Sequence, residues 1–214
     1  MKTRISLKAL FIFGLSLALL FPFRPVRADG QTGLPAFSDF TSAVMDGQAN
    51  IIRGVYVPGV LAYRVVQQPA DNPGYVSTVD GNVTQFGMAA QFKVIGLLAH
   101  NNLAGAAFSN LTVGQVVWIV DGDGEVSAYT INYVARFQAL QPESPTSNFL
   151  DLETNTLYSA QQVFDMFYEG AEHLTFQTCI YRDGEASWGR LFVTAFPNRV
   201  TSAHQLHFSV LHRK

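Results

Sequence analysis

Short runs of strand-forming residues, separated by turn residues, recur along most of this chain. The runs are rich in Val, Ile, Phe and Tyr, which suit a pleated, half-buried surface, and Gly, Pro, Asn and Asp lie between them. The expected strands cover residues 51–57, 61–67, 75–79, 92–99, 115–120, 126–140 (bent), 173–180, 188–196 and 205–211. Because few helical patterns interrupt them, the sequence predicts an all-β fold, either a barrel or a sandwich.

One amphipathic helix is expected in the second half of the chain. Ser159 is a suitable N-cap, an apolar stripe at helical spacing follows it, and Gly170 suits the end of the helix. A second short helix or turn is expected near residues 83–90. Residues 141–155 contain two prolines and many small polar residues, and we expect them to form a long exposed loop beside a binding groove.

The first 28 residues have the features of an export segment. Three basic residues precede an apolar stretch over residues 9–21, which is shorter than the ~18–20 residues of a membrane-spanning helix. This segment is expected either to be cleaved after Ala28 or to remain as a membrane anchor, and both alternatives leave the rest of the chain outside the cytoplasm. We expect residues 29–45 to be a linker and residues 46–214 to form one domain.

The charged residues argue against two kinds of ligand. The whole chain carries a formal charge of −2, and its first 28 residues hold five basic and no acidic residues, so the remainder stands at −7. A nucleic-acid-binding domain would need a basic excess. The acidic run at residues 121–125 is expected to be a Gly-rich hairpin turn, because Val126 holds the position where an EF-hand calcium loop requires glycine. No metal or cofactor is expected.

Cys179 is the only cysteine, so it has no partner for an internal disulfide. In an exported chain such a thiol is buried, paired with another chain, or used chemically. On an extended strand, Thr175, Gln177 and Cys179 share one face, which is more polar than the opposite face. If the next run pairs with this strand, Arg190 approaches the thiol, where a guanidinium can stabilise the negative charge that develops in acyl transfer.

A thiol used in acyl transfer also needs a proton donor and acceptor, and histidine is the usual choice. His173 lies on the same face as Cys179, but six strand residues separate them by about 20 Å. His100 follows the apolar run at residues 94–99, and three further histidines lie near the C-terminus, at positions 204, 207 and 212. Spacing alone does not choose among these four.

Three segments resemble the sortase family. Residues 175–179, Thr-Phe-Gln-Thr-Cys, are similar to the sortase signature Thr-Leu-Xaa-Thr-Cys, with Phe176 in place of leucine. Arg190, within Gly-Arg-Leu-Phe-Val, matches the sortase arginine. The segment Ala-His-Asn-Asn at residues 99–102, with the later Phe108, Leu111 and Gly114, resembles the histidine segment of the family, although Gln115 replaces its aspartate. The resemblance covers roughly residues 51–197.

This resemblance implies a closed sortase-like β-barrel of about eight strands with one or two short helices. It implies a cysteine transpeptidase in which Cys179 attacks the carbonyl carbon of a sorting signal resembling Leu-Pro-Xaa-Thr-Gly. His100 would protonate the leaving amine and then activate an incoming amine, and Arg190 would hold the substrate or the oxyanion. Thr178 and Ile180, on either side of the cysteine, would contact the substrate.

The partners implied are a secreted protein bearing a sorting signal and an amine acceptor on the cell envelope, with no nucleic acid and no cofactor. Two alternatives share the barrel. A sortase-fold peptidase would release its product to water, and a non-catalytic extracytoplasmic binding domain would hold an inert thiol.

Overall fold

The computed structural model describes residues 33–198. The expected export segment, the strand expected at residues 205–211 and the three C-terminal histidines lie outside the described residues. The helices are α1 (Phe37–Val44), α2 (Gly87–Ala90), the 3₁₀-helix η1 (Ala104–Asn110) and α3 (Ala160–Tyr168). The strands are β1 (Ile52–Val57), β2 (Leu61–Gln67), β3 (Asn82–Gln85), β4 (Val94–Leu98), β5 (Val116–Asp121), β6 (Val126–Ala139), β7 (Phe149–Asp151), β8 (Leu157–Tyr158), β9 (His173–Arg182) and β10 (Glu185–Pro197).

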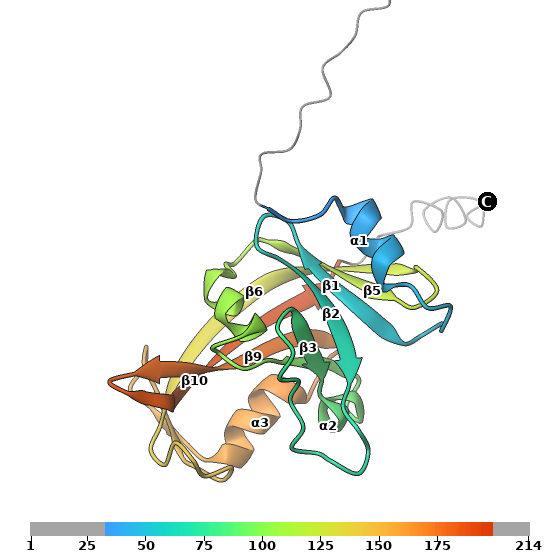
Figure 1. Ribbon diagram of the computed structural model, residues 1–214. Coiled ribbons are helices and arrows are strands. Elements are labelled where there is room, and N and C mark those ends of the chain that lie inside the picture. Colours follow the sequence, from blue (N-terminus) through green and yellow to red (C-terminus); the bar gives the residue numbers. More distant parts are fainter. Residues whose placement is uncertain (1–32, 199–214) are drawn as a thin grey trace, which may run out of the picture. The chain divides into compact units, whose positions relative to one another are not determined.

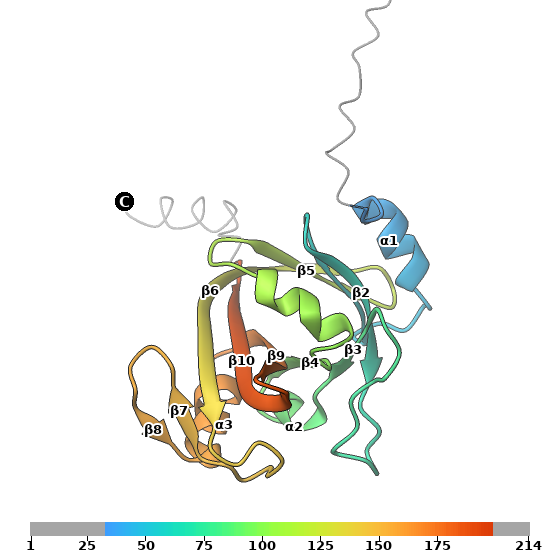
Figure 2. The same cartoon turned by 60° about the vertical axis from the view of Figure 1, so that its left-hand side comes forward.

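Eight of the described strands close into a barrel (Figures 1 and 2). Hydrogen bonding runs in the order β10-β9-β4-β3-β2-β1-β5-β6, and β6 then pairs with β10 to complete the ring, while β7 and β8 extend outward from β6. The pairs β2–β3 and β4–β9 are parallel and the other pairs are antiparallel. The predicted all-β class and the closed barrel of about eight strands are therefore confirmed.

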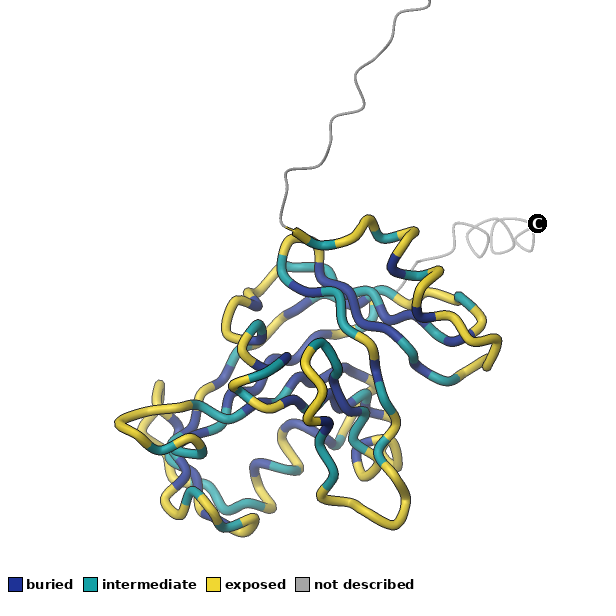
Figure 3. The backbone as a smooth tube through the Cα atoms, viewed as in Figure 1, coloured by how far each residue is buried: buried dark blue, intermediate teal, exposed yellow. Residues whose placement is uncertain are grey.

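Strand alternation divides the side chains between the inside and the outside of the barrel. Leu174 and Phe176 of β9 and Val193 of β10 are fully buried in the central core. The outer face of the same strands is covered by α3, where the rings of Phe167 and Phe192 stack at a centroid distance of 4.1 Å. Figure 3 shows buried residues gathered along the strands and exposed residues at the loops. Both faces of β9 are thus packed over most of its length, which holds the strand rigidly.

The predicted amphipathic helix is confirmed as α3. Ser159 accepts a hydrogen bond from the N–H of Gln162, whose side chain accepts one from the N–H of Ser159, so the helix begins with a complete capping box. Gly170, two residues beyond the helix, has φ of +100°. Within residues 33–198, no helix combines the length and the apolar character that crossing a membrane requires.

Helix α1 lies within residues 29–45, the range expected to be a linker. Its residues Phe40 and Val44 are buried and pack against Tyr56 and Val120 on the outside of β1 and β5. A Cβ atom at Gly54 would come within 2.9 Å of the Phe40 ring. Glycine at this position lets the helix approach the sheet closely.

The prediction of a strand at residues 75–79 is wrong. The carbonyl oxygens of Pro73 and Tyr75 accept hydrogen bonds from the side-chain amide of Gln68, and the N–H of Ser77 is bonded to the hydroxyl of Thr84. Side chains therefore satisfy this backbone, and the neighbouring strand is instead β3, at Asn82–Gln85. The expected helix or turn near residues 83–90 is reduced to α2, and the long loop expected at residues 141–155 contains β7.

Candidate active site

Cys179 is a half-buried free thiol near the end of β9, between strands β4 and β10. On one side it lies directly opposite Arg190 in the antiparallel pairing of β9 with β10. Residues opposed in this way have Cβ atoms about 4.5–5.5 Å apart and project from the same face of the sheet. The pairing that brings Arg190 beside the thiol is therefore present.

On the other side of Cys179, the parallel pairing of β4 with β9 leads to His100. Leu98 is the register partner of Gln177, and the N–H of Ala99 donates to the Gln177 carbonyl at 3.2 Å, which extends the ladder by one residue. Continued for one more residue, the same register brings His100 level with Cys179. The register of β4 with β9 thus leads toward His100, two residues beyond the end of β4, while Arg190 lies on the neighbouring strand at the other side of Cys179.

The guanidinium of Arg190 is held by backbone carbonyl groups. Its Nη1 donates to the oxygens of Ser187 and Gly189, both at 2.9 Å, and its Nη2 donates to that of Pro142 at 3.2 Å. These bonds use three of the five N–H groups that an arginine carries. The side chain is therefore fixed in place and still has donors for an oxygen of a bound substrate.

The backbone of His100 is anchored while its side chain is exposed. Its carbonyl oxygen accepts hydrogen bonds from the N–H groups of Leu103 and Gly105, both at 3.0 Å. Within the described part of the chain, its ring makes no hydrogen bond, so the imidazole is available for proton transfer. The next residue, Asn101, donates its side-chain amide to the Ala186 carbonyl at 2.9 Å, which ties the histidine segment to the β9–β10 hairpin.

Thr178 and Ile180, the expected substrate-binding residues, have unequal access to a ligand. Thr178 is buried and donates its hydroxyl to the Ala99 carbonyl at 2.8 Å, so this side chain joins β9 to the histidine segment. Ile180 is half-buried. Both line a pocket of about 330 Å³ together with Cys179. The same pocket is lined by Asn101, from the segment that resembles the histidine segment of the family, and by Arg136, which the sequence did not single out.

Helix η1 closes over this region because Gly105 has no side chain. Figure 2 shows η1 as the green helix across the opening of the barrel, where it contacts β3, β9 and β10. A Cβ atom at Gly105 would lie 2.7 Å from the His100 carbonyl oxygen and 2.8 Å from that of Ala99, and it would also meet the hydroxyl of Thr178. Only glycine fits where η1 approaches the carboxyl end of β4.

Gly105→Ala is therefore expected to lower the free energy of unfolding by about 3 kcal/mol, because the added methyl group meets backbone atoms that cannot move aside. Urea titration of both proteins measures the difference. Gly74→Ala is the matched control, since its Cβ would meet a single atom at 3.8 Å, and we expect a change within about 0.5 kcal/mol. Equal stability of the two variants would contradict the close packing of η1.

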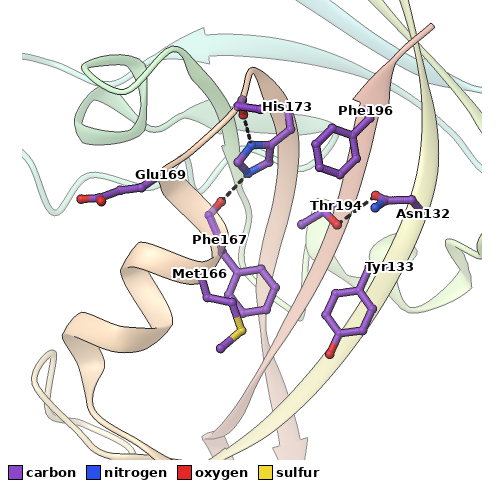
Figure 4. A pocket seen from close by; sticks show the side chains of 9 residues that line it. Asn132, Tyr133, Met166, Phe167, Glu169, His173, Thr194 and Phe196 are labelled. Carbon is purple, nitrogen blue, oxygen red and sulfur yellow. Dashed lines mark hydrogen bonds between the residues drawn. The ribbon is translucent and has the colours of Figure 1, made fainter.

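His173 is committed to a structural role at the other end of β9. Its Nδ1 lies 2.7 Å from the Ala171 carbonyl oxygen and its Nε2 lies 2.9 Å from that of Phe167, and the side chain is buried (Figure 4). A pocket of about 430 Å³ lies beside it, between the end of α3 and strands β6 and β10. The ring has no nitrogen available for chemistry at Cys179.

Between His173 and Cys179, the outer face of β9 is held against α3 by side-chain hydrogen bonds. Thr175 donates its hydroxyl to the Phe167 carbonyl at 2.8 Å, and Tyr168 donates its hydroxyl to the side-chain oxygen of Gln177. Burial raises the pKa of Tyr168 well above its ordinary value, so this phenol stays protonated and keeps donating. The predicted alternation is confirmed, and Cys179 is the next residue on this face.

Residues 121–125 form the turn of the β5–β6 hairpin, as predicted, with Gly124 at a φ of +90°. Within the described ranges, no group of three or more His, Cys, Asp or Glu side chains gathers in a way that would hold a metal ion.

No protein-family model and no curated protein matches this chain. Solved sortase structures are similar to it in fold. Sortase C-1 from Actinomyces oris is 10% identical, covering 78% of this chain and 83% of that chain, with a TM-score of 0.47. Sortase A from Corynebacterium diphtheriae is 11% identical, covering 73% and 64%, with a TM-score of 0.47. Sortase C from Clostridium perfringens, solved with its C-terminal cell wall sorting motif, is 15% identical, covering 76% and 83%, with a TM-score of 0.44.

Proposed function

We propose that this protein is a sortase-like cysteine transpeptidase. It cleaves a sorting-signal peptide through a thioacyl-enzyme intermediate and transfers the acyl part to an amine at the cell surface. The observation that carries the proposal is the pairing of β9 with β10, in which Arg190 lies directly opposite Cys179. The β4–β9 register, continued two residues beyond Leu98, leads to His100. A nucleophile, a proton carrier and a fixed cation are the groups that acyl transfer requires.

In the first half-reaction, the Cys179 thiol transfers its proton to His100, and the sulfur attacks the carbonyl carbon of the scissile peptide bond. The carbonyl oxygen becomes negatively charged, and Arg190, held by three backbone carbonyl groups, donates to it or to the adjacent substrate backbone. When the tetrahedral intermediate collapses, the C–N bond breaks and His100 protonates the leaving amine. The products of this step are a thioester on Cys179 and a released amine.

In the second half-reaction, an incoming amine attacks the carbonyl carbon of the thioester. His100, now neutral, removes a proton from this amine, the new amide bond forms, and the sulfur leaves as a thiolate. The acyl part is thereby joined to the acceptor without any cofactor. Water in place of the amine would give simple hydrolysis.

The surroundings of Cys179 and Arg190 fit a peptide substrate. Residues 141–155 begin beside the proposed site, because the Pro142 carbonyl accepts a hydrogen bond from Arg190. We propose that this loop and residues 181–187 form the walls of the peptide groove. Thr178 and Ile180 line the pocket next to Cys179 and would contact the substrate on the leaving-amine side of the scissile bond. The proposed substrate is a secreted protein with a sorting signal, and the proposed location is extracytoplasmic.

The test is incubation of the protein with peptides resembling Leu-Pro-Xaa-Thr-Gly and an amine, followed by mass spectrometry. A ligated product and an acyl adduct on Cys179 are expected. Adduct formation with only the hydrolysed acid as product would identify a sortase-fold peptidase instead. A thiol that does not react with mild alkylating agents at neutral pH, with no turnover of any peptide, would identify a non-catalytic binding barrel and end the proposal.

A further inference from the structure

The pocket beside Cys179 contains a second arginine, on the opposite face of the sheet from Arg190. Leu191 is the register partner of Arg136 on β6 and of Thr178 on β9, while Arg190 is the partner of Phe137 and Cys179. The two rows are adjacent, and consecutive residues of a strand project from opposite faces. Arg190 therefore serves one side of the cysteine, and Arg136 lines the pocket on the other side.

The guanidinium of Arg136 lacks a counter-charge. Within residues 33–198 it makes neither an ion pair nor a hydrogen bond, and no acidic residue lines its pocket. Three other polar side chains there already donate to carbonyl groups: Asn101 to Ala186, Ser109 to Ala106 and Thr178 to Ala99. A guanidinium that is exposed in a pocket and faces no anion is suited to bind a carboxylate through two parallel hydrogen bonds.

The order of the proposed reaction assigns an occupant to this pocket. The second half-reaction is the chemical reverse of the first, so the incoming amine takes the position from which the leaving amine departed. Cys179 both pairs with Arg190 and lines the pocket, and β4 ends at Leu98, before the level of the cysteine. If the donor peptide is held on the outer face with Arg190, the amine component is left with the space on the pocket side of Cys179.

We propose that this pocket binds the amine acceptor and that Arg136 selects acceptors bearing a carboxylate close to the amine. This inference rests on the proposed transpeptidase function. The carboxylate has two sources, the C-terminus of a short amino acid or peptide acceptor, or an acidic side chain next to its N-terminus. Both present the same planar anion to the guanidinium.

Three acceptors separate these sources. Diglycine amide has no carboxylate, diglycine has a free C-terminal carboxylate, and Gly-Glu amidated at its α-carboxyl group only has a side-chain carboxylate. The rate of transfer from a preformed acyl-enzyme is measured against acceptor concentration. We expect kcat/KM to be at least about tenfold higher for a carboxylate-bearing acceptor than for diglycine amide. Which of the two is preferred identifies the source.

Arg136→Gln is expected to remove this preference, so that kcat/KM for the carboxylate-bearing acceptors falls to about that for diglycine amide in the same variant. Arg136→Lys is expected to restore part of it, because lysine keeps the charge but loses the paired geometry. Arg53→Gln is the matched control, since Arg53 lies on β1, does not line the pocket and is paired with Asp46, and its loss should leave the preference intact. An unchanged preference in Arg136→Gln, or none in the wild type, would overturn the inference.

A binding measurement keeps this result distinct from failure of the transpeptidase proposal. Saturation-transfer NMR on Cys179→Ala, which cannot turn over, should detect diglycine or Gly-Glu amide more strongly than diglycine amide, and Arg136→Gln in that background should remove the difference. If the wild type forms no acyl adduct, the transpeptidase proposal fails by itself. If the adduct forms but neither assay depends on Arg136, only the acceptor inference fails.

Discussion

Cys179→Ala is expected to abolish the acyl adduct and to lower the rate of peptide transfer by at least about 10⁴-fold, because the chain has no other cysteine to replace the nucleophile. Arg190 and the pocket remain in this variant, so binding of the peptide should persist. Intact-protein mass spectrometry detects the adduct, and single-turnover kinetics with a fluorescent peptide measures the rate.

The stability of this variant serves as its control. Cys179 is half-buried, so its truncation should cost no more than about 1 kcal/mol of unfolding free energy. A folded variant that loses activity therefore reports on chemistry and not on structure. In the wild type, excess sorting-signal peptide should slow alkylation of the thiol. Full activity in Cys179→Ala would refute the proposed function at once.

The sequence was most informative where structure depends on neighbours in the chain. Strand β2 has the predicted bounds, and the limits of β9 differ only at its far end, because runs of β-branched and aromatic residues bounded by turn residues define strands locally. Ser159 and Gly170 bounded α3 for the same reason, since caps act within one turn. The approach of Arg190 to Cys179 was also predictable, because a hairpin joins their two strands.

Features that depend on distant pairings were not predictable in this way. Arg136 reaches the pocket only because β6 closes the barrel against β10, and nothing local to Arg136 signals that register. The position of His100 along β9 depends on the parallel pairing of β4 with β9. Sequence spacing therefore did not distinguish His100 from the C-terminal histidines, and only the family resemblance identified it as the proton carrier. Helix η1 is built from small residues whose packing, at Gly105 above all, is set by tertiary contacts.

His100→Gln is expected to lower kcat for transfer by about 10²- to 10⁴-fold, because glutamine can accept and donate hydrogen bonds but cannot carry a proton from one half-reaction to the next. The exposed ring makes no hydrogen bond within residues 33–198, so its replacement should leave the free energy of unfolding within about 0.5 kcal/mol of the wild type. Pre-steady-state kinetics separates acylation from transfer, and both rates should fall.

His173→Gln is the matched control and should give the opposite result. His173 is buried, and both of its ring nitrogens lie within hydrogen-bond distance of carbonyl oxygens, so its replacement should cost about 1–3 kcal/mol of stability. The rate per folded molecule should stay within about twofold of the wild type, since this side chain lies at the far end of β9 from Cys179. If His100→Gln loses activity but keeps its stability, and His173→Gln loses stability but keeps its activity, proton transfer is assigned to His100. If both variants turned over at the wild-type rate, the proton carrier would have to be sought among the C-terminal histidines.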